Sequence, residues 1–142
     1  MCRAFAPVLG QHSESVIVNV LSAAGIVAVP GMGGYSPSKF AGRALSTCIR
    51  AELAGQNTNV IALIVGSVDT RIAAHVEGYK EPPSLIADAG LKAIKQRASE
   101  VDTDFMAIDV RARLARDPAA LEMQMRRSLS GERVTTGRAT PQ

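Results

Sequence analysis

The chain has 142 residues, of which 46% are hydrophobic and 20% charged, and its formal net charge is +3. These values suit one globular domain and exclude an extensively disordered chain. Aromatic residues make up only 4% and tryptophan is absent, so the core must consist of aliphatic side chains. No apolar run approaches the roughly 18 residues of a membrane span, and the N-terminus has no signal-peptide pattern. We therefore expect a cytoplasmic protein that does not bind membranes.

The positions of the cysteines and arginines argue against three further features: a disulfide framework, a metal site and a nucleic-acid interface. Cys2 and Cys48 have neither CxxC spacing nor a histidine cluster, so neither a disulfide framework nor a metal site is expected. Arginines gather near the C-terminus in a Ser/Thr/Gly-rich stretch, and we predict a flexible basic tail over residues 132–142. Because no aromatic residue or binding motif accompanies this charge, nucleic-acid binding is not expected.

The first half of the chain predicts a helix, a strand, a loop and a long helix. Residues 3–9 resemble the end of a helix that begins before Met1, and the β-branched run 15–20 suits a buried parallel strand. Residues 23–34 hold four glycines and one proline, which indicates a loop. From Ser36 apolar residues recur at helical spacing until a stop at Gly55.

The second half opens with another apolar run, residues 59–65, which predicts a strand that ends at Gly66. Strand, long helix and strand together form a βαβ unit with a right-handed crossover. Three further elements are expected: a helix capped by Ser84, a short strand over 105–108, and a last helix from Asp117 to about Gly131.

Tyr35 and Lys39 are the most informative pair, because residues four apart share one helix face. An ammonium beside a phenol favours the phenolate, which suits an acid/base catalyst. Ser22 lies at the end of the strand 15–20, and residues 66–70 follow the next strand. Since parallel strands present their carboxyl ends at one edge, these residues predict a proton-transfer site there.

Each of these residues also has a purely structural interpretation. Tyr35 could be a surface tyrosine at a helix start, and Lys39 a solvated charge. Ser22 could be a turn residue, and Thr70 a helix cap.

Three segments together resemble the C-terminal half of a short-chain dehydrogenase/reductase, an NAD(P)-dependent Rossmann family. Val18-Asn-Val-Leu-Ser-Ala-Ala-Gly25 is similar to that family's catalytic-serine strand, and Tyr35-Ser-Pro-Ser-Lys39 matches its Tyr-x-x-x-Lys. Val65-Gly-Ser-Val-Asp-Thr70 resembles its Pro-Gly-x-Val-x-Thr segment, with valine in place of the proline. The resemblance extends over about residues 4–108 and more loosely to 131.

The resemblance implies an α/β fold, namely part of a Rossmann-like doubly wound parallel sheet, over residues 1–131. It also implies hydride transfer between NAD or NADP and a carbonyl or secondary alcohol, with no metal. Tyr35 would donate or accept the proton, Lys39 would assist it and bind the nicotinamide ribose, and Ser22 would polarise the substrate oxygen. Gly66, Val68 and Thr70 would contact the nicotinamide end of the cofactor.

Two further expectations concern partners. The segment after Thr70 is mostly apolar, which suggests an apolar small-molecule substrate. In the family the long helix often packs in a subunit interface, and Ala41, Ala44 and Ala51 would allow close helix approach. A homo-oligomer is therefore expected.

The sequence contains no Gly-x-x-x-Gly-x-Gly after a strand, although the family uses such a turn to bind the dinucleotide. The family's helix asparagine also falls outside the chain. The strand 15–20 would then have an unpaired edge that is prone to association. The alternative hypothesis is therefore a truncated, catalytically inactive remnant that acts as a dimerisation or partner-binding module.

Overall fold

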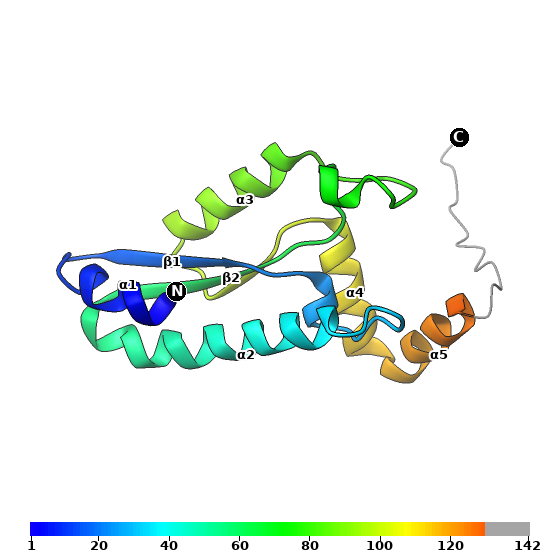
Figure 1. The fold of residues 1–142 in the computed structure, drawn as a ribbon, viewed down its shortest axis with the longest axis horizontal. Coiled ribbons are helices and arrows are strands. Elements are labelled where there is room, and N and C mark those ends of the chain that lie inside the picture. The colour runs from blue at the N-terminus through cyan, green and yellow to red at the C-terminus, as the bar shows by residue number, and fades with distance from the viewer. Residues whose placement is uncertain (130–142) are drawn as a thin grey trace.

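A three-stranded parallel sheet with helices on both faces forms the centre of the protein (Figure 1). The computed structural model describes residues 1–129, so the predicted basic tail, residues 132–142, lies outside the described residues. The elements in chain order are α1 (Cys2–Leu9), β1 (Ser15–Val20), η1 (Ala23–Gly25), α2 (Tyr35–Leu53), η2 (Ala54–Gln56), β2 (Thr58–Ile64), η3 (Arg71–Ala73), α3 (Pro83–Lys95), β3 (Glu100–Asp102), α4 (Phe105–Arg116) and α5 (Pro118–Leu129), where η marks 3-10 turns.

The strand order is β1-β2-β3, and all pairs are parallel. Ser15 pairs with Thr58 at the start of β1 and Val20 with Leu63 at its end, while Ala62 of β2 pairs with Glu100 of β3. Within the described sheet β1 has a neighbour on one side only. The predicted α/β class, with a parallel βαβ unit from β1 through α2 to β2, is confirmed.

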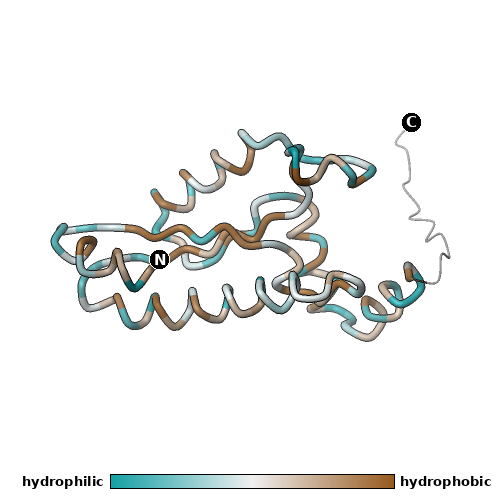
Figure 2. Tube along the Cα trace, in the orientation of Figure 1, coloured by the Kyte–Doolittle hydropathy of each residue, from teal (hydrophilic) through white to brown (hydrophobic). Residues whose placement is uncertain are grey.

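The core lies on the two faces of β2, which is almost entirely buried. Side chains of successive strand residues point to opposite faces, so β2 contributes to two clusters. One cluster joins Ile61, Leu63 and Val65 to Ala93 of α3, and the other joins Ile64 to Ile26 and Ala107. The hydrophobic colouring of the central strands in Figure 2 marks this region. A strand buried on both faces explains the continuous apolar run that predicted it.

Helix α2 runs along one face of the sheet, and α3 lies on the other (Figure 1). Near the C-terminal end of α2, the guanidinium of Arg50 donates hydrogen bonds to the carbonyls of Val60 and Ser99, both at 2.6 Å. Charge-assisted bonds of this kind are stronger than neutral ones. They fix the far end of α2 to β2 and to the residue before β3.

The predicted strand over 105–108 is wrong: these residues begin helix α4, and the third strand is Glu100–Asp102. The Asp104 carboxylate accepts a hydrogen bond from the backbone N–H of Ala107 at 3.0 Å, which caps the helix and sets its start. The apolar residues Phe105 and Ile108 are largely exposed on α4.

Other boundaries differ by small steps. Helix α3 begins at Pro83 with Pro82 as its cap residue, so Ser84 does not cap it. After α2 the chain continues through η2 and reverses at Asn57. The left-handed conformation that ends the helical segment is therefore at Asn57, with a φ of 55°, and not at the predicted stop, Gly55. Helix α5 begins as predicted, since the Asp117 carboxylate accepts from the N–H of Ala120 at 2.9 Å. None of the helices in residues 1–129 is long and apolar enough to cross a membrane.

Candidate active site

The predicted site residues follow the carboxyl ends of β1 and β2. Beyond β1, the N–H of Leu21 donates to the carbonyl of Leu63 and the N–H of Ala23 to the carbonyl of Val65, both at 2.8 Å. The chain therefore remains beside β2 past the end of the regular strand. This pairing brings Ser22 next to Val65 and Gly66.

Ser22 occupies the cap position of η1. Its hydroxyl oxygen accepts a hydrogen bond from the N–H of Ala24 at 3.1 Å, and the residue is half-buried. The turn interpretation of Ser22 therefore holds, but it does not conflict with a site role. Because the hydroxyl acts as an acceptor in this bond, its hydrogen remains able to donate to a substrate oxygen.

Tyr35 and Lys39 lie together at the start of α2. The Lys39 Nζ atom is 5.4 Å from the centroid of the Tyr35 ring, which is a cation–π distance. The backbone of Tyr35 is held by two bonds: its N–H donates to the carbonyl of Met32 at 2.8 Å, and its carbonyl accepts from the Ser38 hydroxyl at 2.6 Å. Tyr35 is 45% exposed, so its phenol is accessible from solvent.

The loop before α2 returns the chain to the strand ends. Gly31 and Gly33 adopt positive φ angles of 80° and 42°, which a residue with a Cβ rarely adopts. The buried Ser36 hydroxyl accepts a hydrogen bond from the N–H of Val29 at 3.1 Å. The loop is thereby attached to the first turn of the helix that carries Tyr35.

Gly66, Val68 and Thr70 follow β2 at the same edge of the sheet. The N–H of Gly66 donates to the Asp104 carboxylate at 2.7 Å, and Val68 forms a parallel bridge with Glu81. Thr70 is exposed, and its hydroxyl lies 3.4 Å from the carbonyl of Val68. Thr70 precedes η3 but forms no side-chain cap bond, so its hydroxyl is not used as a cap.

Asp104 is a buried residue at this edge that the sequence analysis missed. It is 4% exposed and follows β3, as Gly66 follows β2. The sequence does carry a local signal: an aspartate directly before a helical stretch is a preferred N-cap residue. The expectation of a strand over 105–108 concealed this signal.

A network of four charged side chains connects α2, β3 and α4. Arg43 contacts Glu100 at 2.7 Å, and Arg111 contacts both Glu100 at 2.7 Å and Asp102 at 2.5 Å. Burial alone would raise the pKa of Glu100, but the hydrogen bonds and charges of Arg43 and Arg111 together hold it below its usual value. The hydrogen bond to Asp102 is the main reason that the pKa of Arg111 is raised. Arg43 lies one turn beyond Lys39, so this network fixes the helix next to the site.

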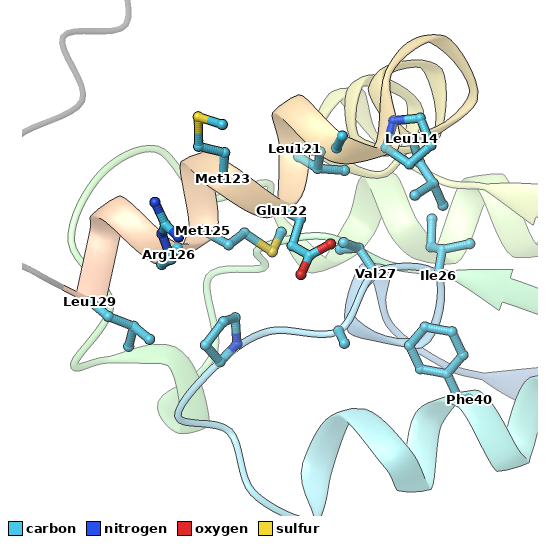
Figure 3. A pocket seen from close by; sticks show the side chains of 14 residues that line it. Ile26, Val27, Phe40, Leu114, Leu121, Glu122, Met123, Met125, Arg126 and Leu129 are labelled. Atoms are coloured by element: carbon cyan, nitrogen blue, oxygen red, sulfur yellow. The ribbon is translucent and has the colours of Figure 1, made fainter.

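An apolar cavity of about 740 Å³ opens between α5 and the loop that joins Ser22 to Tyr35 (Figure 3). Ser22 and Tyr35 do not line it, but residues 26–28 and Pro30 of that loop do. Helix α5 and Leu114 of α4 form one wall, and the loop and Phe40 of α2 form the facing one. The lining residues are Ile26, Val27, Ala28, Pro30, Phe40, Leu114, Pro118, Ala119, Leu121, Glu122, Met123, Met125, Arg126 and Leu129.

The segment after Thr70 is the one whose apolar character suggested an apolar substrate. Its apolar side chains are largely exposed, with Ile72 at 86% and Tyr79 at 75%. The Lys80 ammonium donates to the carbonyl of Ala73 at 3.0 Å and closes this loop on itself. In residues 1–129 no group of three or more His, Cys, Asp and Glu side chains is arranged to hold a metal ion.

Comparison with known proteins identifies the family. The sequence profile of the short chain dehydrogenase family matches residues 1–80. The chain is 31% identical over 108 residues to the ketoacyl reductase HetN of Nostoc sp., an alignment that covers 71% of this chain and 38% of that protein.

Solved structures agree with this result. A short chain dehydrogenase from Burkholderia cenocepacia in complex with NADP is 36% identical, with a TM-score of 0.83, over 88% of this chain and 52% of that one. A short-chain dehydrogenase from Sphingobium yanoikuyae in complex with NADPH, 21% identical with a TM-score of 0.67, shares the fold over 99% of this chain and 54% of that one. The chain thus spans about half the length of these structures and less of HetN. It belongs to the short chain dehydrogenase family.

Proposed function

We propose that this chain carries the proton-transfer centre of an NAD(P)-dependent oxidoreductase that interconverts a carbonyl and a secondary alcohol. The observation that carries the proposal is the Tyr35–Lys39 pair, with the ammonium 5.4 Å from the ring centroid, at the sheet edge where Ser22 lies. An exposed phenol beside a cation is suited to proton exchange with a bound oxygen atom.

In this proposal the side chains handle the proton and the oxygen atom. The Ser22 hydroxyl donates a hydrogen bond to the carbonyl oxygen of the substrate. Tyr35 transfers its proton to that oxygen as the C=O π bond opens, and Lys39 stabilises the phenolate that remains. In the oxidative direction the Tyr35 phenolate accepts the proton of the alcohol.

The donor set at the strand ends fits the nicotinamide end of NAD or NADP. Lys39 and Thr70 supply an ammonium and an exposed hydroxyl, and Gly66 and Val68 supply backbone beside them. The nicotinamide, when bound, supplies or accepts the hydride. Family relatives crystallised with NADP and NADPH support this choice of cofactor.

The proposed substrate is an apolar small molecule with a carbonyl or alcohol group. The cavity beside the loop from Ser22 to Tyr35 is lined mainly by aliphatic and methionine side chains, which suits an alkyl chain. The ketoacyl reductase among the relatives supports a carbonyl group as the reacting centre.

Cofactor binding and turnover test the proposal together. Calorimetric titration of the purified chain with NAD(H) and NADP(H) should show saturable binding. Tyr35→Phe removes the proton donor but keeps the ring, so turnover of a ketone should fall at least about a hundredfold while the melting temperature stays within about 2 °C. Absence of binding at millimolar cofactor, or unchanged turnover in Tyr35→Phe, would contradict it.

A second candidate function is a dimerisation or partner-binding module, and exposed side chains of α2 favour it. Ala41, Ala44, Leu45 and Cys48 are all exposed and recur at the spacing of one helix face, with Leu45 at 58%. A homo-oligomer formed through this face would bury them. Sedimentation equilibrium should then show a dimer or larger species that Leu45→Glu dissociates. A chain that dimerises but binds no cofactor would favour this function over catalysis.

A further inference from the structure

Asp104 uses its two carboxylate oxygens on two different segments. Oδ1 accepts from the N–H of Ala107 at 3.0 Å and caps α4, while Oδ2 accepts from the N–H of Gly66 at 2.7 Å, 38 residues earlier in the chain. The Thr103 hydroxyl lies 2.9 Å from Oδ2 and 3.0 Å from the carbonyl of Ile64. One buried side chain thus connects the ends of β2 and β3.

The bond to Gly66 is additional to the bond that caps α4, and a helix cap does not need it. Asp117 caps α5 with the same kind of bond, to the N–H of Ala120 at 2.9 Å, but it is exposed, whereas Asp104 is buried. Burial of a carboxylate is costly unless its oxygens are hydrogen-bonded. The N–H of Gly66 is therefore one of the groups that make this burial tolerable.

Where the chain after β2 passes Asp104, there is no room for a side chain on residue 66. A Cβ built on Gly66 would overlap Asp104 Oδ1 and stand 2.7 Å from the Cβ of Met106. Gly66 is therefore required for the close approach of backbone to carboxylate. Together, the glycine and the aspartate fix the point where the chain leaves the sheet.

A second attachment lies only a few residues further on. The N–H of Glu81 donates to the carbonyl of Ser67, and the N–H of Asp69 donates to the carbonyl of Glu81, both at 2.8 Å. Val68 and Thr70 thus lie just beyond the Asp104 attachment and beside the Glu81 one. The Asp104 attachment is made by a single side chain, so it can be removed by one substitution.

We propose that Asp104 is a positioning residue for the cofactor-contacting segment 66–70. It does not touch the cofactor or the substrate. Through its bond to Gly66 it fixes where Val68 and Thr70 lie relative to the carboxyl ends of the strands. This inference rests on the proposed function, because the segment matters for catalysis only if it contacts a nicotinamide cofactor.

Amide hydrogen exchange in the full chain tests the attachment itself, without cofactor. Asp104→Asn keeps the side-chain size but leaves one acceptor oxygen for two backbone N–H groups. The Gly66 amide should exchange at least tenfold faster, while the Leu21 amide, bonded to Leu63 between β1 and β2, reports global opening. Asp117→Asn is the matched control, since it weakens a cap of the same kind on α5. An unchanged Gly66 rate, or equal acceleration in the control, overturns the proposal.

Steady-state kinetics test the consequence for the cofactor. Asp104→Asn should raise the KM for NADH or NADPH, whichever the unsubstituted chain uses, at least fivefold with kcat changed less than threefold. Asp117→Asn should leave this KM within a factor of two. A fall in kcat at constant KM, or equal effects in both variants, overturns the positioning role. If the unsubstituted chain shows no turnover, the proposed function fails instead, and the exchange measurement decides the role of Asp104 alone.

Discussion

Gly25 and Lys39 lie in direct backbone contact. A Cβ built on Gly25 would stand 2.9 Å from the carbonyl oxygen of Lys39 and 3.2 Å from its Cβ, closer than side-chain atoms normally approach. Gly25 ends the 3-10 turn that Ser22 caps, and Lys39 belongs to the helix that begins with Tyr35. The contact therefore joins the serine side of the candidate site to the tyrosine–lysine side.

Gly25→Ala should push the 3-10 turn that Ser22 caps away from the first turns of α2. The added methyl group meets backbone rather than a flexible side chain, so we expect a loss of about 1–3 kcal/mol in the free energy of unfolding, measured by urea denaturation. Turnover should fall as well, because reacting groups must be held in near-attack geometry. Gly55→Ala is the control: a Cβ there meets nothing within 4 Å, and the change should stay within about 0.5 kcal/mol. Equal effects at the two glycines would contradict the role assigned to the contact.

The positions of the candidate site residues could be predicted because their signals are local. The β-branched run before Ser22, the glycine-rich stretch and the helical spacing after Tyr35 each define one element within about twenty residues. Parallel pairing of β1 and β2 then brings the residues that follow the strands to one edge. Their chemical roles remain proposals.

The contacts that hold this edge together could not be predicted, because they join segments far apart in the sequence. Gly66 and Asp104 are separated by 38 residues, and Arg43 and Glu100 by 57. A single sequence gives no signal for such pairing. β3 has only three residues and mixed polarity, so periodicity could not identify it, and the apolar residues after Asp104 were taken for the strand instead.

Glu100 should stabilise the fold in a pH-dependent way. Its pKa is held below the usual 4.5 in the folded chain by Arg43 and Arg111, which outweigh the opposing effect of burial. The stabilisation is therefore present above about pH 4.5 and disappears as the pH falls through the lower folded-state pKa. Glu100→Gln should lower the free energy of unfolding by about 1–2 kcal/mol at pH 7, and the difference should shrink below pH 4.5.

The control for this prediction is Glu14→Gln. Glu14 pairs with Arg97 on the surface, and its side chain is 65% exposed, so its loss should cost less than about 0.5 kcal/mol. Urea denaturation from pH 3 to pH 7 measures both variants. If the loss in the free energy of unfolding caused by Glu100→Gln grew as the pH fell, the role assigned to Glu100 would be contradicted.

Tyr79 should titrate above its usual pKa of 10.0. The hydrogen bond from its hydroxyl to Glu81 at 2.9 Å is the main cause, followed by the negative charge of that carboxylate. The chain has two tyrosines, so in Tyr35→Phe the absorbance titration of tyrosinate reports Tyr79 alone. Adding Glu81→Gln should return the midpoint towards 10.0, while adding Glu77→Gln, in the same loop, should not. A midpoint insensitive to Glu81 would refute the assigned bond.

Ala28→Trp should narrow the apolar cavity and change substrate preference by chain length, if the proposed function holds. Ala28 is exposed and lines the cavity, and an indole there would occupy space otherwise open to an alkyl chain. Each buried CH₂ contributes about 0.8 kcal/mol, so excluding two or more should lower kcat/KM for long-chain ketones about tenfold or more. Short ketones should change less than twofold, and Ala87→Trp on α3, away from the cavity, should affect neither.

The substitution also provides a readout that needs no turnover. Because the sequence contains no tryptophan, residue 28 would be the sole indole, and its emission should shift to the blue when a long-chain ketone enters the cavity. Emission from Ala87→Trp should not respond. If kcat/KM falls equally for all chain lengths and the emission stays constant, the alkyl chain binds elsewhere. The exposed segment that includes Ile72 and Tyr79 would then be the next place to examine by the same substitution.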